Sequence, residues 1–343
     1  MKKNKKLVVI LFILFLLVNV FFVSNLYYDK KDINVMKENN FKEFIYYSSN
    51  KITLKNLKRY FVSCIFSDTD TSRFMDLWDD FYKIDSITYD KFNECDGMVP
   101  QGLCIIDDKI LVTEYCKCGA SHDSLIIVLN KTTGEREKTL ILKDNKIHVG
   151  GITYNSDTDK VCITGKQYKR YSTIYEIDIF DILSLDDGDF LTKYNEVPVP
   201  LNETSFLTYN KVDKELYIGY FAIPFKKGHF YMFDNDMLIE NYDCLMQGCD
   251  FFRTNGYVAI SHSYGPMNSV ISINKIDNNG IIETESIDKI VAPPFLEEIA
   301  IDYETEKLYC LFESGAKPYR NSTELSIDGI VVLDFKDYIK LYG

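Results

Sequence analysis

The chain has 343 residues, of which 46% are hydrophobic and 26% are charged. These proportions are those of a globular protein, and they exclude a wholly disordered, collagen-like or coiled-coil chain. Its 51 acidic residues outnumber its 39 basic residues, and no Lys/Arg cluster follows the N-terminal lysines. Such a chain repels phosphate backbones, so nucleic acid is not expected as a partner.

The first predicted element is an apolar helix close to the N-terminus. Residues 7–23 read LVVILFILFLLVNVFFV, and four lysines precede them, at positions 2, 3, 5 and 6. A helix that is apolar on every face is typical of a membrane, and a helix over residues 7–28 spans about 33 Å. Positive charge before the helix predicts a cytoplasmic N-terminus. We therefore predict a signal anchor (domain 1–28, transmembrane 7–28) that holds a single-pass protein in the cell membrane, with the rest of the chain extracytoplasmic.

A cleaved signal peptide is the alternative interpretation of this segment. Residues 20–28, VFFVSNLYY, contain no A-x-A-like cleavage site, and no cysteine follows the apolar run to accept a lipid. These absences favour an uncleaved anchor.

Residues 29–94 are predicted to form a polar stalk followed by a short helical segment. Within residues 67–84, the apolar side chains have the spacing of one helix face. They are Phe74, Leu77, Trp78, Phe81 and Ile84.

From residue 98 onward, the sequence repeats one phrase of two short apolar strands joined by a polar turn. The copies open with MVPQGLCIIDD, HVGGITYNSDT, ETSFLTYNKVD, MQGCDFFRTNG and FLEEIAIDYET, and corresponding positions lie 49, 55, 42 and 50 residues apart. Repeats of this length form four-stranded blades that stack around an axis. We therefore predict an all-β fold, a β-propeller domain over 95–343. Five blades are preferred over six, which would require residues 85–97 and the C-terminus to share a sheet. A β-sandwich does not predict this recurrence.

The phrases MVPQGL, HVGGITY, SHSYG, PPFLEEI and LFESGAKPYR resemble the repeats of a family of exported bacterial β-propeller proteins of uncharacterised activity. More distantly, they resemble the NHL, SMP-30 and TolB-like propellers. The resemblance covers roughly residues 95–338 and implies the fold and the location only. In SMP-30 lactonases, a central Glu, Asn and Asp set holds a divalent metal. Glu298 and Glu313 stand in similar places, but no Asn partners are evident, so lactonase chemistry is not expected.

In a propeller, the residues that open the inner strands converge at the mouth of the axial channel. Equivalent positions in the five repeats therefore predict site residues at the starts and ends of these strands. One further candidate is an arginine in a loop that could fold over the mouth. The candidate ligand-binding residues are Gln101, Glu114, His148, Lys166, Ser205, Tyr220, Gln247, His262, Tyr264 and Arg320.

A divalent cation is the cofactor that these residues suggest. Glu298, Glu313 and His148 could supply its oxygen and nitrogen ligands, and the ion would polarise a substrate or activate a water. Adjacent strand residues point to opposite faces, so only one of Glu297 and Glu298 can line the channel. The structural alternative is that these polar groups bond the backbone of neighbouring blades and order channel water. A serine nucleophile is not supported, because no G-x-S-x-G motif is present.

The nine cysteines are an odd number, so at least one stays unpaired in a monomer. Cys244 and Cys249 are placed to form a short-loop disulfide in an exported domain. In contrast, three cysteines within apolar strand patterns are predicted to be small buried hydrophobes: Cys104, Cys162 and Cys310. The C-x-C pair at residues 116–118 is not expected to bind metal, because we find no second cysteine pair or nearby histidine to complete a zinc site.

Three functional hypotheses follow. The first is a membrane-anchored extracytoplasmic propeller that binds a small-molecule ligand or an envelope protein at its axial mouth. The second is a metal-assisted hydrolase or lyase that acts in the channel. The third is a purely structural role in the envelope.

Overall fold

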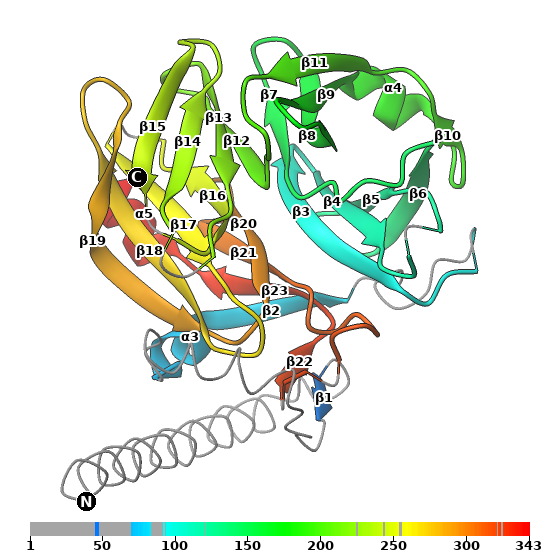
Figure 1. Cartoon of the computed structure of the whole chain (residues 1–343). Coiled ribbons are helices and arrows are strands. Elements are labelled where there is room, and N and C mark those ends of the chain that lie inside the picture. The colour runs from blue at the N-terminus through cyan, green and yellow to red at the C-terminus, as the bar shows by residue number, and fades with distance from the viewer. Residues whose placement is uncertain are drawn as a thin grey trace, which may run out of the picture.

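The protein is an all-β, five-bladed β-propeller (Figure 1). The computed structural model describes residues 45–47, 70–83, 92, 94–119, 121–223, 226–242, 244–253, 256–320, 322–323 and 325–343. The signal anchor predicted over 7–28 lies outside these residues. In the part of the chain that is described, no helix has both the length and the apolar character needed to cross a membrane.

The first two blades follow each other along the chain. In blade one, β10 joins the outer edge in parallel orientation. It lies in the connection between the third and fourth strands of blade two, together with the short helix α4 (Ile179–Ser184). From the axis outward, blade one comprises β3 (Met98–Ile106), β4 (Lys109–Cys116), β5 (Leu125–Asn130), β6 (Arg136–Leu142) and β10 (Phe190–Leu191), and blade two comprises β7 (Ile152–Asn155), β8 (Lys160–Gln167), β9 (Ser172–Asp178) and β11 (Asn195–Val199).

Blades three and four are antiparallel sheets of four strands in simple up-and-down order. Blade three comprises β12 (Phe206–Asn210), β13 (Glu215–Tyr220), β14 (Gly228–Met232) and β15 (Met237–Tyr242), and blade four comprises β16 (Met246–Phe251), β17 (Tyr257–His262), β18 (Ser269–Ile276) and β19 (Ile282–Ala292).

The fifth blade joins the two ends of the described chain. Its three inner strands are C-terminal, and its outer strand is β2, which pairs antiparallel with β23. The blade is thus built from β20 (Leu296–Asp302), β21 (Lys307–Phe312), β23 (Gly329–Asp334) and β2 (Trp78–Lys83). This pairing closes the ring, and the described chain contains five blades rather than six.

Three further elements lie outside the blades. Helix α3 (Ser72–Leu77) precedes β2, and helix α5 (Lys336–Tyr342) follows β23. A two-stranded antiparallel sheet pairs β1 (Ile45–Tyr47) with β22 (Leu325–Ile327), which lies between β21 and β23 in the chain.

The segment predicted as one helix over residues 67–84 is therefore only partly helical. The helix ends at Leu77, and Trp78 begins β2, which lies before the range 95–343 predicted for the propeller. The helical spacing was misleading because Trp78 and Phe81 belong to the outer strand of the fifth blade, where they join the apolar cluster between blades four and five. A register irregularity between Trp78 and Asp80 keeps both aromatic side chains buried.

Five of the apolar clusters lie between neighbouring blades, one at each interface around the ring. Alternation along each strand supplies both faces of a sheet. In β21, Leu308 and Cys310 face blade four, whereas Tyr309 and Leu311 face blade one. Each blade therefore buries both faces only because it has a neighbour on each side.

The inner strands β3, β7, β12, β16 and β20 follow one another around the axis. Glycine permits the close approach of β7 to β12: a Cβ at Gly150 would lie 2.1 Å from the Ser205 carbonyl oxygen, and one at Gly151 would lie 2.6 Å from the Leu207 nitrogen. Glycine at this strand opening therefore serves the packing of neighbouring inner strands.

We predict that Phe81→Ala lowers the free energy of unfolding by about 3–5 kcal/mol. Phe81 is buried in the closing strand and stacks on Trp78, with 6.3 Å between ring centroids. Urea unfolding of the two proteins measures the change. The matched control is Phe180→Ala, whose side chain is 71% exposed and which should change stability by less than about 0.5 kcal/mol. Equal effects of the two substitutions would contradict closure by β2.

Candidate axial site

An open cavity of ≈490 Å³ lies at the axis, at the ends where the inner strands begin. All five blades contribute to its wall. Six residues nominated or considered from the sequence line it: Gln101, His148, Ser205, Gln247, Glu297 and Glu313. We call this cavity the axial mouth.

A pair of buried carboxyl groups dominates the chemistry of the axial mouth. Glu297 is in inner strand β20, and Glu313 directly follows β21, so both come from blade five. The two side chains share a hydrogen bond, and burial together with their mutual repulsion raises the pKa of Glu297 well above its usual range. Burial also raises the pKa of Glu313. The pair therefore favours holding a proton between its two carboxyl groups.

Blade one and a connection within blade five supply the polar partners of this pair. The Gln101 amide Nε2 donates to Glu313 Oε2 at 3.2 Å and to the Pro100 carbonyl at 2.7 Å. Tyr319 hydrogen-bonds Glu313, and the Lys117 ammonium lies 3.6 Å from the centroid of the Tyr319 ring. The positive charge of Lys117 lowers the pKa values of both carboxyl groups, but not enough to overcome burial.

His148 is placed in the axial mouth as a neutral imidazole. Burial, and to a lesser degree the charge of Lys117, lowers the pKa of His148 to about 4. Its ring packs against Tyr115, with 4.3 Å between centroids. At neutral pH, His148 therefore offers an uncharged donor and acceptor rather than a cation.

The remaining nominated residues do not line the axial mouth. Three of them contact other side chains or the backbone instead. The Tyr220 ring stacks on the His229 ring, with 4.6 Å between centroids. His262 Nε2 hydrogen-bonds the Ser272 hydroxyl at 2.9 Å, and Arg320 donates to the Gly315 carbonyl at 2.6 Å. The other three lie nearby in the sheets or loops: Glu114 is buried in β4, Lys166 is part-buried in β8, and Tyr264 stacks beside Phe221.

The metal set proposed from the sequence is not brought together. Glu298 lies apart from Glu313 and His148, in the wall of a second cavity of ≈170 Å³ formed by the other ends of the inner strands. Its Oε1 accepts from the Ile299 amide at 3.1 Å, and burial raises its pKa well above the usual range. As expected from strand alternation, only one of the two adjacent glutamates lines the axial mouth, and it is Glu297.

Several mouth residues were not identified from the sequence: Ile147, Gln167, Thr204, Phe221 and Tyr319. Each of the five is the direct sequence neighbour of a nominated residue. A register irregularity between Thr164 and Gln167 places Gln167, rather than Lys166, at the wall. The repeat phrase located each strand exit, but strand alternation alone could not reveal this shift.

The cysteines also differ from two expectations. Cys244 and Cys249 are not joined by a disulfide, so the predicted bridge is wrong. The three strand cysteines are buried as predicted, at 7%, 2% and 0% exposure for Cys104, Cys162 and Cys310.

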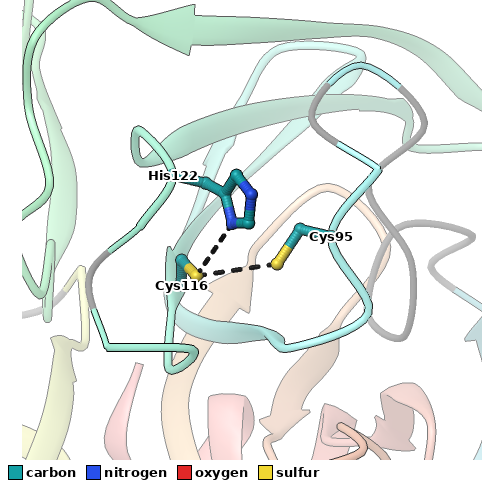
Figure 2. Close-up of side chains that lie close together, drawn as sticks. All are labelled: Cys95, Cys116 and His122. Atoms are coloured by element: carbon teal, nitrogen blue, oxygen red, sulfur yellow. Dashed lines mark hydrogen bonds between the residues drawn. The ribbon is translucent and has the colours of Figure 1, made fainter.

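The expectation that no histidine lies near the C-x-C pair is wrong. Cys95, Cys116 and His122 converge there (Figure 2), and their ligand atoms all lie within 4.8 Å of one another. The signal that was missed is the short C-x-C-x₃-H spacing, since His122 follows Cys118 by four residues.

Comparisons with known proteins do not identify a family. No protein-family model and no curated protein matches this chain. Among solved structures, Kuenenia stuttgartiensis hydrazine synthase is 10% identical with a TM-score of 0.40, and the match covers 71% of this chain and 66% of that one. A chain of a nidogen/laminin complex is 14% identical over 69% of this chain and 86% of that one, with a TM-score of 0.41. A Dos1 propeller is 9% identical over 64% and 68%, with a TM-score of 0.34.

We predict that Glu297→Gln changes the pH dependence of stability. Because the folded pKa values of the pair are raised, the folded state binds more protons than the unfolded state above pH ~4.3, the ordinary glutamate pKa. The stability contributed by the protonated pair is complete below that pH and is lost as pH rises through the folded pKa values. Urea unfolding from about pH 4, near the ordinary glutamate pKa, up to about pH 8 should therefore show a steeper loss of stability in the native protein than in the variant.

The control for this prediction is Glu285→Gln, which changes an exposed carboxylate in β19. It should leave the pH dependence as it is in the native protein. Identical slopes for Glu297→Gln and the native protein would contradict the proton-sharing pair.

Proposed function

We propose that this protein is a membrane-anchored, extracytoplasmic propeller that binds a small, uncharged polar ligand at its axial mouth. The observation that carries the proposal is the convergence of polar groups from all five blades on one open cavity. The predicted signal anchor over 7–28 and the acidic composition support the location.

The size and chemistry of the axial mouth favour a small molecule. Its ≈490 Å³ fall within the usual range of about 300–1,000 Å³ for small-molecule pockets. Amide groups of Gln101, Gln167 and Gln247, with the hydroxyl of Ser205, offer both donors and acceptors.

The carboxyl pair specifies the charge of the ligand. A pair that shares one proton both donates and accepts hydrogen bonds, and Lys117 offsets its remaining negative charge. An anionic ligand would be repelled by the negative charge of the pair, and a cationic ligand would be repelled by Lys117. A ligand rich in hydroxyl or amide groups, such as a sugar, satisfies these partners without an unpaired charge, and the rings of Phe221 and Tyr319 in the wall offer it apolar faces.

Binding is a better account than hydrolysis. Glycoside hydrolases separate their two carboxyl groups by about 5–9.5 Å to admit the sugar or a water, whereas Glu297 and Glu313 are in hydrogen-bond contact. Glu298, Glu313 and His148 cannot form the site of a metal-assisted hydrolase or lyase, because Glu298 lies in the other cavity.

Thermal unfolding of the full chain in detergent, with a panel of neutral mono- and oligosaccharides as probes, tests the proposal. A sugar present at 100 times its dissociation constant should stabilise the protein by about 2.7 kcal/mol, which raises Tm by about 5 °C in a domain of this size. Gln101→Ala and Glu297→Gln should abolish the shift, because both remove partners at the axial mouth.

The matched control, Glu285→Gln, should retain the full shift. The proposal is contradicted if no neutral polar probe shifts Tm, or if a shift persists unchanged in both mouth variants. A cross-linked envelope protein that depends on the same two residues would favour a protein partner instead.

A further inference from the structure

A second cluster of chemically reactive side chains lies beside the axial mouth, at the end of β4. Cys116 is the last residue of that strand, Cys95 lies shortly before β3, and His122 is in the connection to β5 (Figure 2). The Cys116 sulfur lies 3.6 Å from the Cys95 sulfur and 3.2 Å from His122 Nδ1. Both cysteine side chains are buried, at 2% and 5% exposure for Cys95 and Cys116.

These distances are close to those of a tetrahedral zinc site. Zn–S bonds of about 2.3 Å and a Zn–N bond of about 2.05 Å at tetrahedral angles separate two sulfurs by about 3.8 Å, and a sulfur from a nitrogen by about 3.6 Å. The two distances from the Cys116 sulfur are therefore a few tenths of an ångström shorter than in a filled site. Two thiolates and an imidazole are soft and borderline ligands, which select zinc over magnesium or calcium.

Backbone amides donate hydrogen bonds to both sulfurs at this place. The Gly97 N–H donates to the Cys95 sulfur at 3.4 Å, and the Cys118 N–H donates to the Cys116 sulfur at 3.3 Å. Such outer hydrogen bonds orient metal ligands.

The cluster also lies next to two contacts at the axial mouth. Cys116 stands between Tyr115, which packs against His148, and Lys117, which lies over Tyr319. In addition, the Lys117 amide donates to the Gly97 carbonyl at 2.9 Å, which ties the chain after Cys116 to the chain after Cys95. An ion in the cluster would pin both segments together and hold the rim of the mouth in place.

We propose that Cys95, Cys116 and His122 bind one zinc-class ion, which fixes the end of β4 at the rim of the axial mouth. Binding releases the thiol protons, and no electron transfer is involved. The proposal does not depend on the ligand of the axial mouth. Its main rival is a disulfide between Cys95 and Cys116, whose sulfurs are not bonded here.

The test is zinc binding by the full chain, purified in detergent with a reductant and stripped of metal. Mass spectrometry of metal content after zinc addition should give one ion per chain, and a chromophoric chelator should measure its affinity. Cobalt added in place of zinc should give the absorption of a tetrahedral site with sulfur-to-metal charge transfer. Cys95→Ser, Cys116→Ser and His122→Gln should each weaken zinc binding about 100-fold or more, beyond the loss typical of an outer-sphere change.

Matched controls remove the same residue types elsewhere. Cys162→Ala removes a buried thiol from β8, and His229→Gln removes a half-buried imidazole from β14; both should bind zinc as the native chain does. Thermal unfolding provides a second readout that separates misfolding from loss of a ligand. Zinc should raise the Tm of the native chain and both controls, but not that of Cys116→Ser.

The proposal is overturned if the reduced native chain binds no zinc, or if the three ligand variants bind it as tightly as the controls. It is also overturned if the native chain carries a Cys95–Cys116 disulfide and, after reduction, still binds no zinc. None of these results would affect the sugar-binding test of the axial mouth, so failures of the two proposals are distinguishable.

Discussion

The structure depends on one packing constraint: every blade is apolar on both faces and must be covered on both. Five clusters of buried side chains fill the five gaps between blades, and no blade can leave the ring without exposing two of them. The ring must therefore close. Closure is achieved by β2, a strand from well before the repeats, which pairs with β23 from the end of the chain.

Closure has a direct chemical consequence at the axis. The carboxyl pair of blade five meets the amide of Gln101 from blade one, although Gln101 and Glu313 are separated by 212 positions in the sequence. Packing between blades excludes water from these groups, and this burial raises the pKa values of both glutamates. The raised pKa values at the axial mouth thus depend on the apolar packing between the blades around it.

The sequence could predict much of this architecture because repeat phase and strand alternation are local signals. The recurring phrase located the blades, and the adjacency of Glu297 and Glu298 correctly predicted that one of them faces away from the mouth. Three features depend on contacts that no local pattern records. Trp78 and Phe81 have helical spacing but belong to a strand whose partner is far along the chain. A register irregularity places Gln167 instead of Lys166 at the wall of the axial mouth. Cys95 comes close to Cys116 only because β3 pairs with β4.

The account predicts that blades one and five meet at the axis, and a double-mutant cycle across that contact tests it most directly. Gln101→Ala, Glu313→Ala and the double variant would be compared by urea unfolding at constant pH. Because Gln101 Nε2 donates to Glu313 Oε2, the two substitutions should be coupled by at least about 0.5 kcal/mol. Effects that add to within about 0.3 kcal/mol would contradict the closed ring and the mouth built on it.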